Sequence, residues 1–247
     1  MLLYLYAMCF HYSLTLEQAA IARQVHAAWG SYQWQPVYHA DGFSFLQMPV
    51  ITQEAPERIQ PMHWGLIPAW TKNREDAEKI RAQTLNARAE TIFEKPSYRH
   101  SIRHQRCLIP ADGFFEWMDV KKKKYPHYIY LKQHALFCFA GIYASWTDLE
   151  TGEHIDSFSI ITCEANPMME RIHNLKQRMP VILTPQQYHD WLQPALSQEA
   201  ITALLQPYPE HAMENHTIGK LITSRSSSSN VPEVMAQYHY SEFNTLF

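Results

Sequence analysis

The sequence predicts an α+β protein with one domain built on a largely antiparallel β-sheet. Short apolar and aromatic segments, the pattern of β-strands, recur along the chain, and only a few segments with helical periodicity interrupt them. With 247 residues, 46% of them hydrophobic and 13% aromatic, the chain can bury a substantial core. We find no linker that would divide the chain. We therefore expect a single domain over residues 9–247, preceded by a short separate segment, residues 1–8.

Two segments have the pattern of helices. Residues 14–30 place apolar side chains at helical spacing, and we expect Thr15 to cap this helix and Gly30 to end it. Residues 76–84 are polar and charged, which is typical of an exposed helix. Proline and glycine interrupt residues 33–51, which we predict as loops and short strands.

Most of the other segments have the pattern of strands. Residues 60–70 predict a strand that ends in a loop containing glycine and proline, and the four lysines at 121–124 predict a solvated hairpin turn. A second hairpin turn is predicted at Thr151 and Gly152, and a loop at the serine run 226–229. Further strands are expected at residues 128–131, 135–146 and 158–162.

The cysteines and histidines argue against a metal site. The four cysteines form no Cys-x-x-Cys pair, which disfavours a zinc ribbon or a disulfide framework and favours a reducing cytoplasm. Cys107, Cys138 and Cys163 lie in apolar segments, where a cysteine is ordinarily a small buried side chain. None of the 14 histidines belongs to an HExxH motif or a similarly spaced pair. We therefore expect no metal ion and no cofactor.

Residues 1–7 are apolar, yet they lack the features of a targeting segment. No lysine or arginine precedes them, and they are far shorter than the roughly 20 apolar residues of a membrane span. We expect no membrane association. A second methionine, Met8, stands directly before Cys9. Residues 1–8 are therefore either a removable leader or the result of a misassigned start, and the latter is the simpler explanation.

A basic segment between positions 86 and 106 indicates an anionic partner. Such a local surplus of positive charge, in a chain of formal net charge -3, favours an anion such as DNA held at one face. The spacing of Arg99 and Arg103 is equally typical of a solvated helix face. Trp70 precedes further cations and is either a core residue or a stacking platform for a nucleobase. The segment has two glutamates and five cations, which are Arg88, Lys95, Arg99, Arg103 and Arg106.

Glu116 is a candidate general acid or base. Turn-forming residues occupy positions 109–113, and an aromatic strand is predicted to follow them. Alternation along this strand puts Phe114 and Glu116 on one face, and Phe115 and Trp117 on the other. A carboxyl group desolvated beside an aromatic ring has a raised pKa and can transfer protons near neutral pH. The alternative is an ordinary exposed glutamate on an edge strand.

His173 is a second candidate. It stands among cations, ahead of the apolar segment 179–183. It is either a core histidine with satisfied hydrogen bonds or a proton-transfer group beside an anion site, and its sequence context alone favours the core interpretation.

With these segments in place, the chain resembles the SOS response-associated peptidase (SRAP) family, the abasic-site-processing proteins. The resemblance implies a single mixed domain around a barrel-like sheet surrounded by helices. It covers residues 8 to about 191, and the C-terminal part is similar only loosely. The motifs that carry it are Met8-Cys9, WGLIP at 64–68 with Trp70, NARAE at 86–90, ADGFFEW at 111–117, and Ile172-His173 leading to RMPV at 178–181.

The resemblance implies a protein of the DNA-damage (SOS) response that captures abasic sites in single-stranded DNA covalently through an N-terminal cysteine. Carried over by motif, Cys9 is the crosslinking residue, Asn86 and Arg88 hold the lesion and its phosphate, and Glu116 and His173 handle protons. Self-processing peptidase (hydrolase) activity and lyase activity are implied as well. We expect a monomer located in the cytoplasm at the nucleoid. Further DNA contacts are assigned to Trp70, Arg99, Arg103, Arg178 and His11.

The first residues depart from the family pattern. The family often begins Cys-Gly-Arg, whereas this chain has Cys9, Phe10 and His11. The arginine that would reach a phosphate is absent, so this contact must come from His11 or elsewhere, or be lost.

The chemistry of a terminal cysteine supports the resemblance. Its α-amine has a pKa of about 7.7–8.0 and its thiol one of about 8.5, so both are partly deprotonated near neutral pH. The amine can form an imine with the open-chain aldehyde of an abasic sugar, and the thiol can then close a five-membered thiazolidine ring. Because an amide nitrogen cannot form the imine, Cys9 must become the terminus. Either translation starts at Met8, which is then removed, or the protein cleaves its own leader with Cys9 as nucleophile and Glu116 as base.

Two other classes of function remain open at this point. A cysteine peptidase acting on other proteins would use Cys9 as nucleophile, His173 as base and Asn86 to orient the histidine. A non-covalent single-stranded-DNA-binding module would need neither the thiol nor the amine of Cys9, and its affinity would fall steeply with salt.

Overall fold

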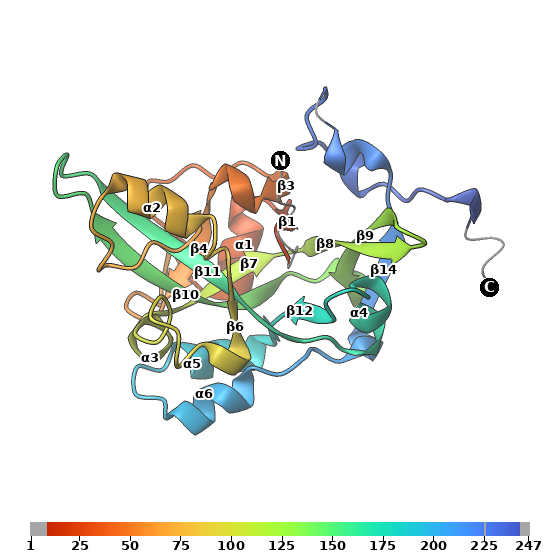
Figure 1. Ribbon diagram of the computed structural model, residues 1–247. Helices are drawn as coiled ribbons and strands as arrows, with labels where there is room; N and C mark the ends of the chain where they lie inside the picture. Colours follow the sequence, from red (N-terminus) through yellow and green to blue (C-terminus); the bar gives the residue numbers. More distant parts are fainter. Residues whose placement is uncertain (1–8, 225, 243–247) are drawn as a thin grey trace.

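A closed five-stranded β-barrel forms the centre of the computed structural model, which describes residues 9–224 and 226–242 (Figure 1). Its strands are β4 (Gln47–Thr52), β5 (Arg58–Trp64), β7 (Arg106–Ala111), β10 (Phe137–Thr147) and β11 (His154–Glu164). Neighbouring strands are antiparallel except β5 and β11, which run parallel and close the barrel where Phe158 pairs with Trp64. The predicted α+β class, with a largely antiparallel, barrel-like sheet, is confirmed.

A second antiparallel sheet lies against the barrel, with strand order β14-β9-β8-β1-β3. Its strands are β1 (His11–Leu14), β3 (Val37–Asp41), β8 (Gly113–Val120), β9 (Lys123–Leu131) and β14 (Met213–Thr217). Four short strands extend the barrel sheet: β2 (Ala28–Trp29), β6 (Asn86–Arg88), β12 (Arg178–Pro180) and β13 (Ile182–Leu183). Both β6 and β12 pair with β11, and Thr162 has a partner in each, so the two strands flank the end of β11 on opposite sides.

The helices are short and cover the outside of the sheets. In Figure 1, α3, α5 and α6 gather below the barrel, and α4 lies beside β12 and β14. Within the described residues, no helix is long and apolar enough to cross a membrane. The helices are α1 (Gln18–Val25), α2 (Arg74–Arg81), α3 (Ser101–His104), α4 (Pro167–Ile172), α5 (Pro185–Leu192) and α6 (Gln198–Leu204).

Several local predictions are confirmed. The lysine-rich hairpin turns at Lys121 and Lys122, which have left-handed φ values of 51° and 66°, and the β10–β11 hairpin turns near Gly152, with φ of 75°. The predicted strands at 128–131, 135–146 and 158–162 fall within β9, β10 and β11, apart from two residues before β10. The strand predicted from residue 60 is β5, which ends at Trp64 and is followed by Gly65, a residue with φ of 108°.

The helix predicted over residues 14–30 is wrong in its extent and caps. The helix covers only α1, with Glu17 as N-cap and His26 in the left-handed region as C-cap. The main-chain N–H and the hydroxyl of Thr15 donate instead to the Asp112 carboxylate, at 2.5 and 2.6 Å. Thr15 therefore ties β1 to β8 rather than starting a helix, and β2 follows the helix before Gly30.

The turn predicted over residues 109–113 is also wrong. Strand β7 continues through Pro110 to Ala111, and β8 begins at Gly113, so Asp112 alone is the corner between the barrel and the second sheet. A side chain at Gly113 would place its Cβ 2.2 Å from the Tyr128 hydroxyl oxygen. The glycine is needed for the close passage of two strands rather than for a hairpin.

The basic segment 86–106 is mostly turns, with a 3-10 helix at Ala89–Thr91 and α3 as its only α-helix. Arg106 lies at the start of β7 and is fully buried. Its guanidinium donates to the main-chain carbonyls of Trp191, Ile102, Arg103 and Gln193. Arg106 therefore joins α5 to the barrel and does not belong to a surface patch.

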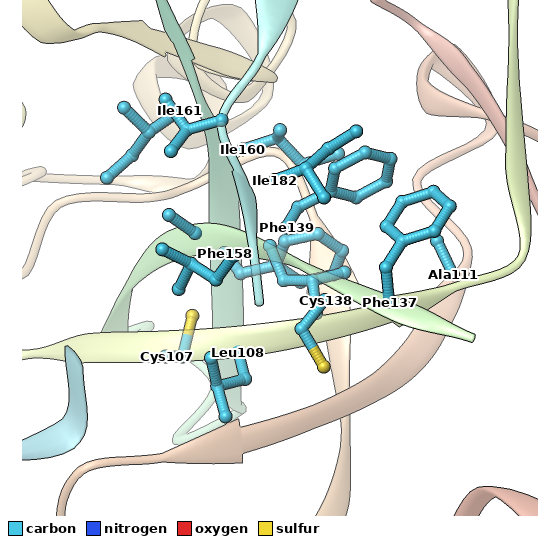
Figure 2. Close-up of a cluster of buried hydrophobic side chains, with 14 of the residues drawn as sticks. Cys107, Leu108, Ala111, Phe137, Cys138, Phe139, Phe158, Ile160, Ile161 and Ile182 are labelled. Carbon is cyan, nitrogen blue, oxygen red and sulfur yellow. The ribbon is translucent and has the colours of Figure 1, made fainter. Parts of the chain in front are cut away.

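The barrel is filled with aromatic and aliphatic side chains. Figure 2 shows part of this core, with Cys107 on β7 and Cys138 on β10 among its residues. Trp64 stacks on Phe158 with ring centroids 6.2 Å apart and an angle of 7° between the rings. Cys107, Cys138 and Cys163 are buried and free, which confirms their interpretation as small core residues.

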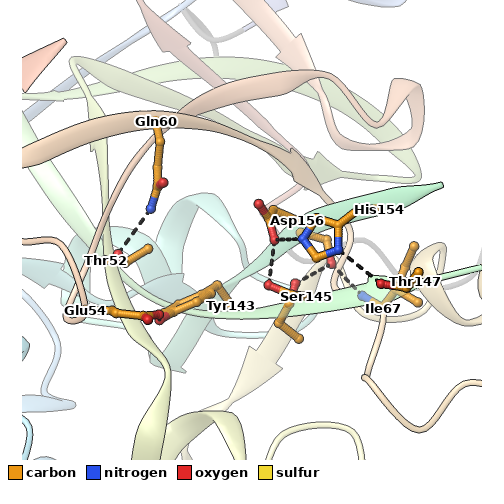
Figure 3. Close-up of polar contacts among 11 residues, drawn as sticks. Thr52, Glu54, Gln60, Ile67, Tyr143, Ser145, Thr147, His154 and Asp156 are labelled. Carbon is orange, nitrogen blue, oxygen red and sulfur yellow. Dashed lines mark hydrogen bonds and ion pairs between the residues drawn. The ribbon is translucent and has the colours of Figure 1, made fainter. Parts of the chain in front are cut away.

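Polar contacts occupy the hairpin end of the barrel (Figure 3). The Asp156 carboxylate accepts a hydrogen bond from the Ser145 hydroxyl at 2.5 Å and lies 3.1 Å from His154 Nε2. The Tyr143 hydroxyl donates to Glu54 at 3.3 Å. Ser145 and Asp156 are directly opposite each other on β10 and β11, so their hydrogen bond stabilises the register of the hairpin.

Candidate active site

Four predicted residues meet where the second sheet joins the barrel. Cys9 lies two residues before the start of β1, Asn86 begins β6, Glu116 lies in the middle of β8 and His173 follows the last residue of α4. All four side chains are buried. Segments far apart in the sequence thus bring together a thiol, an amide, a carboxyl group and an imidazole.

Asn86 holds the main chain of Cys9. Its Nδ2 donates to the Cys9 carbonyl oxygen at 3.0 Å, and the Tyr98 hydroxyl donates to the Asn86 carbonyl at 3.1 Å. Within the described part of the chain, no donor reaches the buried Asn86 Oδ1. The amide therefore anchors Cys9 through one atom and keeps the other available for a donor on a ligand or on Cys9 itself.

Glu116 is buried among apolar groups, as the predicted alternation requires. Phe114 packs into the barrel core, while Phe115 packs on the opposite face of the sheet with Tyr128 and Ile218. Strand β8 lies between β1 and β9, and Glu116 is only 2% exposed, so the interpretation as an exposed edge residue is wrong. Burial raises the pKa of Glu116 to about 7, although the neighbouring His173 favours its charged form.

His173 faces the Glu116 carboxyl group. Its Nε2 lies 3.8 Å from Glu116 Oε2, and its Nδ1 lies 2.9 Å from the main-chain oxygen of Arg178. Because a carbonyl only accepts, Nδ1 carries the hydrogen, and Nε2 turns its lone pair toward the carboxyl group while the ring is neutral. The histidine is a hydrogen-bonded core residue that also borders the reactive carboxyl, so the two interpretations of it are compatible.

The Cys9 thiol is held in its neutral form. It is 2% exposed, and burial raises the pKa of the thiol well above its usual value, to which the nearby Glu116 charge adds. Its Sγ lies 4.0 Å from the His11 main-chain oxygen. A thiol in this environment needs a neighbouring base to become a nucleophile, and Glu116 is such a neighbour.

The predicted DNA-contacting arginines differ in their surroundings. Arg178 donates to both oxygens of Glu90, at 2.5 and 2.9 Å, and to the Thr162 carbonyl oxygen at 2.7 Å. Its guanidinium is therefore already paired, and a phosphate would have to compete with Glu90. Arg88 is exposed at the end of β6, opposite Thr162 of β11.

Trp70, Arg99 and Arg103 all lie on the surface. Trp70 is 58% exposed and donates from Nε1 to the Pro96 carbonyl oxygen at 3.4 Å, so it is not a core residue. Arg103 lies over the Phe93 ring, 5.2 Å from its centroid, and lines a cavity of about 350 Å³ beside α6. Trp70 therefore stands next to the basic segment, whereas Arg103 points toward α6.

His11 forms a chain of hydrogen bonds that the sequence analysis missed. Its Nδ1 lies 2.8 Å from His39 Nε2, and His39 Nδ1 lies 2.6 Å from the hydroxyl of Ser229 in the C-terminal loop. Burial, with His39 as a second cause, lowers the pKa of His11 to about 3. His11 is therefore neutral at physiological pH and does not replace the positive charge of an arginine.

The sequence analysis also missed His127, which lies opposite Glu116 in the β8–β9 pairing. The sequence pattern of residues 124–131 does not show that His127 faces Glu116. That depends on the register of β8 against β9, which only the structure provides. Among the described residues, no group of three or more histidines, cysteines or carboxylates is placed to hold a metal ion.

Comparison with known proteins identifies the family of this chain. The family model described as SOS response associated peptidase (SRAP) matches residues 8–225. The chain belongs to the SRAP family. Abasic site processing protein YoqW of Bacillus subtilis strain 168 is 40% identical over 193 residues, which cover 77% of this chain and 82% of that protein. HMCES of Xenopus tropicalis, also an abasic site processing protein, is 32% identical over 206 residues, 74% of this chain and 58% of that protein.

Solved structures share the SRAP fold described here. A crystal structure of a protein from Bacteroides thetaiotaomicron has a TM-score of 0.88 and 38% identity, and the match covers 94% of this chain and 100% of that one. A second crystal structure, from Bordetella bronchiseptica, has a TM-score of 0.74 and 26% identity, covering 85% of this chain and 100% of that one.

Proposed function

We propose that this SRAP protein processes abasic sites in single-stranded DNA by forming a covalent bond to them through Cys9. The observation that carries the proposal is the placement of Cys9, anchored by Asn86, beside a buried carboxyl group whose pKa is about 7. A group with this pKa can both accept and donate protons at neutral pH. The naming of the relatives YoqW and HMCES as abasic site processing proteins supports the class of substrate.

The reaction requires a free amine on Cys9. The amine attacks the aldehyde carbon of the open-chain sugar, and loss of one water molecule gives an imine. The Cys9 sulfur then adds to the imine carbon, and the thiol proton moves to the nitrogen, which closes the thiazolidine ring. Glu116 and His173 transfer the protons that open the sugar ring and activate the thiol. An imine at this carbon would also permit elimination of the 3′ phosphate, which is the proposed lyase activity.

Cys9 must be exposed as the terminus before this reaction. Residues 1–8 lie outside the described residues. Initiation at Met8 followed by its removal, or self-cleavage by the Cys9 thiol with Glu116 as base, would each free the amine. N-terminal sequencing of protein from its native host distinguishes these routes from an intact Met1, which would contradict the proposal.

The surface around Trp70 and Arg88 suits a single DNA strand. Trp70 offers an exposed indole next to the basic segment, and Arg88 offers a cation at the end of the strand that Asn86 begins. Stacking on an aromatic ring contributes about 1–3 kcal/mol per base. We propose that the protein acts as a monomer on DNA in the cytoplasm.

A peptidase acting on other proteins is less well supported. In such an enzyme a histidine would activate the thiol, and an asparagine would orient the histidine. Here His173 is oriented by the Arg178 carbonyl and faces Glu116, while Asn86 bonds to Cys9. The contacts given for these three residues in the described part of the chain therefore differ from that relay.

Intact-protein mass spectrometry tests the proposal. The protein is measured before and after incubation with a single-stranded oligonucleotide that carries one abasic site. We expect a starting mass that begins at Cys9 and a shift by the mass of the oligonucleotide less one water. Cys9→Ala should lose the shift, and Cys107→Ala, which changes a cysteine of the barrel core, should keep it. A mature Cys9 terminus without any shift would refute covalent capture.

A further inference from the structure

Strand register places a second histidine beside the reactive carboxyl group. Glu116 of β8 and His127 of β9 are directly opposite each other in an antiparallel pair. Side chains opposite each other in this way lie on the same face, with Cβ atoms about 4.5–5.5 Å apart. The neighbouring pair Phe114 and Ile129 packs into the barrel core, which identifies the face. His127 and Glu116 are therefore neighbours on the covered side of the sheet.

The contact with Asn215 determines which ring nitrogen of His127 carries the hydrogen. The imidazole is 6% exposed, and its Nδ1 lies 3.1 Å from Asn215 Oδ1 on β14. The Asn215 Nδ2 is directed at the sulfur of Met168 on α4, at 3.2 Å, which leaves Oδ1 as the acceptor for the ring N–H. Nδ1 therefore carries the hydrogen, and Nε2 presents a lone pair.

Each of the two neighbouring residues Glu116 and His127 has a buried polar atom without a partner among the described residues. In the described part of the chain, nothing hydrogen-bonds to His127 Nε2 or to Glu116 Oε1. Leaving such an atom unpaired costs about 1–3 kcal/mol of stability, so we expect a hydrogen-bonding partner at both atoms. One water molecule between them would satisfy both.

We infer that His127 is a positioning residue that holds a water molecule against Glu116 Oε1. The inference rests on the proposed function only in assigning a reaction to Glu116. When Glu116 is protonated, its O–H donates to the water, and the water donates to His127 Nε2. When Glu116 has given up its proton, the same water turns its second O–H toward the carboxylate. His127 thus holds in place a water molecule that accepts from the protonated carboxyl group and donates to the ionised one.

The other titratable groups around this pair are few. Cys9, His173 and Lys124 influence Glu116 from the start of β1, the end of α4 and strand β9. His216 on β14 disfavours a charge on His127, in addition to the effect of its burial. These surroundings keep His127 neutral and leave the Glu116 proton to be shared through the water.

The test compares four variants with the wild type by infrared titration of the protonated-carboxyl band. Glu116→Gln removes the band and so assigns it. Because phenylalanine replaces both the ring nitrogen and the water by apolar atoms, His127→Phe should raise the titration midpoint by about one pH unit from its value near 7. His127→Gln, which retains polar atoms, should keep it near the wild-type value. His216→Phe changes a histidine on the opposite face of the sheet and should not move it.

A second measurement separates positioning from folding. The crosslinking rate at saturating DNA is followed at pH 7, where a rise of one unit in the Glu116 pKa would reduce the ionised fraction roughly fivefold. We expect a similar loss of rate in His127→Phe, an unchanged half-saturating DNA concentration, and recovery at pH 8. A midpoint that is the same in wild type, His127→Phe and His127→Gln would overturn the inference. Absence of crosslinking by the wild type would refute the proposed function alone, because the infrared titration still measures the effect of His127.

Discussion

Two buried carboxyl groups, four positions apart in the sequence, differ in their hydrogen bonding. Asp112, at the corner between the barrel and the second sheet, accepts hydrogen bonds from the Ser13 hydroxyl and from the main chain and hydroxyl of Thr15, at 2.5–2.6 Å. Glu116 has one oxygen 3.8 Å from His173, and its other oxygen has no partner among the described residues. The two side chains are 6% and 2% exposed, so burial alone does not distinguish them.

This difference in hydrogen bonding distinguishes a structural carboxyl group, Asp112, from a reactive one, Glu116. A carboxylate that accepts three short hydrogen bonds is held in one position and makes a rigid joint. A carboxyl group that is desolvated but incompletely paired has its pKa raised toward neutrality and can exchange protons. The number of hydrogen bonds, and not the exposed fraction, therefore distinguishes the two carboxyl groups.

The largest expected effect is on stability at Asp112. Asp112→Ala leaves the Ser13 and Thr15 donors buried without an acceptor, so we expect the free energy of unfolding to fall by about 3–5 kcal/mol. Chemical denaturation measures the loss, with Asp76→Ala in the exposed α2 as control, where about 0.5 kcal/mol or less is expected. A loss of less than 1 kcal/mol at Asp112 would show that the corner does not depend on these hydrogen bonds.

Glu116→Gln should reduce the crosslinking rate strongly and change stability only slightly, the opposite of Asp112→Ala. We expect the crosslinking rate to fall by about 100- to 1,000-fold, because the amide cannot transfer the proton. The unfolding free energy should change by no more than about 1 kcal/mol at pH 5, since the amide replaces a neutral carboxyl group of similar shape. Single-turnover crosslinking and denaturation are measured on the same preparation. A variant that crosslinks normally would remove Glu116 from the mechanism.

The pH dependence of stability gives a third test. The pKa of Glu116 is about 7 in the folded protein, raised from 4.5, so its contribution to stability is fully present below pH 4.5 and is lost as pH rises through 7. Between pH 5 and pH 8 this loss amounts to about 2–3 kcal/mol. Wild type should therefore lose that much more stability than Glu116→Gln over this range. Parallel curves for the two proteins would show that the carboxyl group is not desolvated.

The smallest expected effect concerns His11, whose Nδ1 lies 2.8 Å from His39 Nε2. His11→Arg introduces a cation where the family often has arginine. One added phosphate contact should steepen the slope of log affinity against log salt by about 0.7 for single-stranded DNA. Titrations with an oligonucleotide that lacks an abasic site, at several salt concentrations, measure this slope. An unchanged slope would place the phosphate elsewhere.

Local patterns in the sequence were sufficient for the strands and for the face that Glu116 occupies. Alternation from Phe114 to Trp117 predicts the two faces correctly, because side chains of a strand must point in turn to opposite sides. The apolar surroundings of Cys107 and Cys138 likewise predict their burial. These properties depend on neighbours within a few residues.

The errors have a common cause. Residues 109–113 carry turn-forming proline and glycine, yet they form two strands, because β7 completes the barrel and β8 must pass close to Tyr128. Thr15 has the chemistry of a helix cap but bonds to Asp112, which is 97 residues away in the sequence. In both places a long-range contact outweighs the local preference.

The sequence by itself determined the fold class and the residue types of the site: a cysteine near the start, a carboxyl group between aromatics, and a histidine before an apolar strand. Only the tertiary structure decided that Asp112 is satisfied and Glu116 is not, and that His127 lies beside Glu116 while Arg178 is paired with Glu90. The reason is physical. Strand register and barrel closure decide which groups meet, and the pKa and pairing of a buried group depend on those neighbours rather than on its position in the chain.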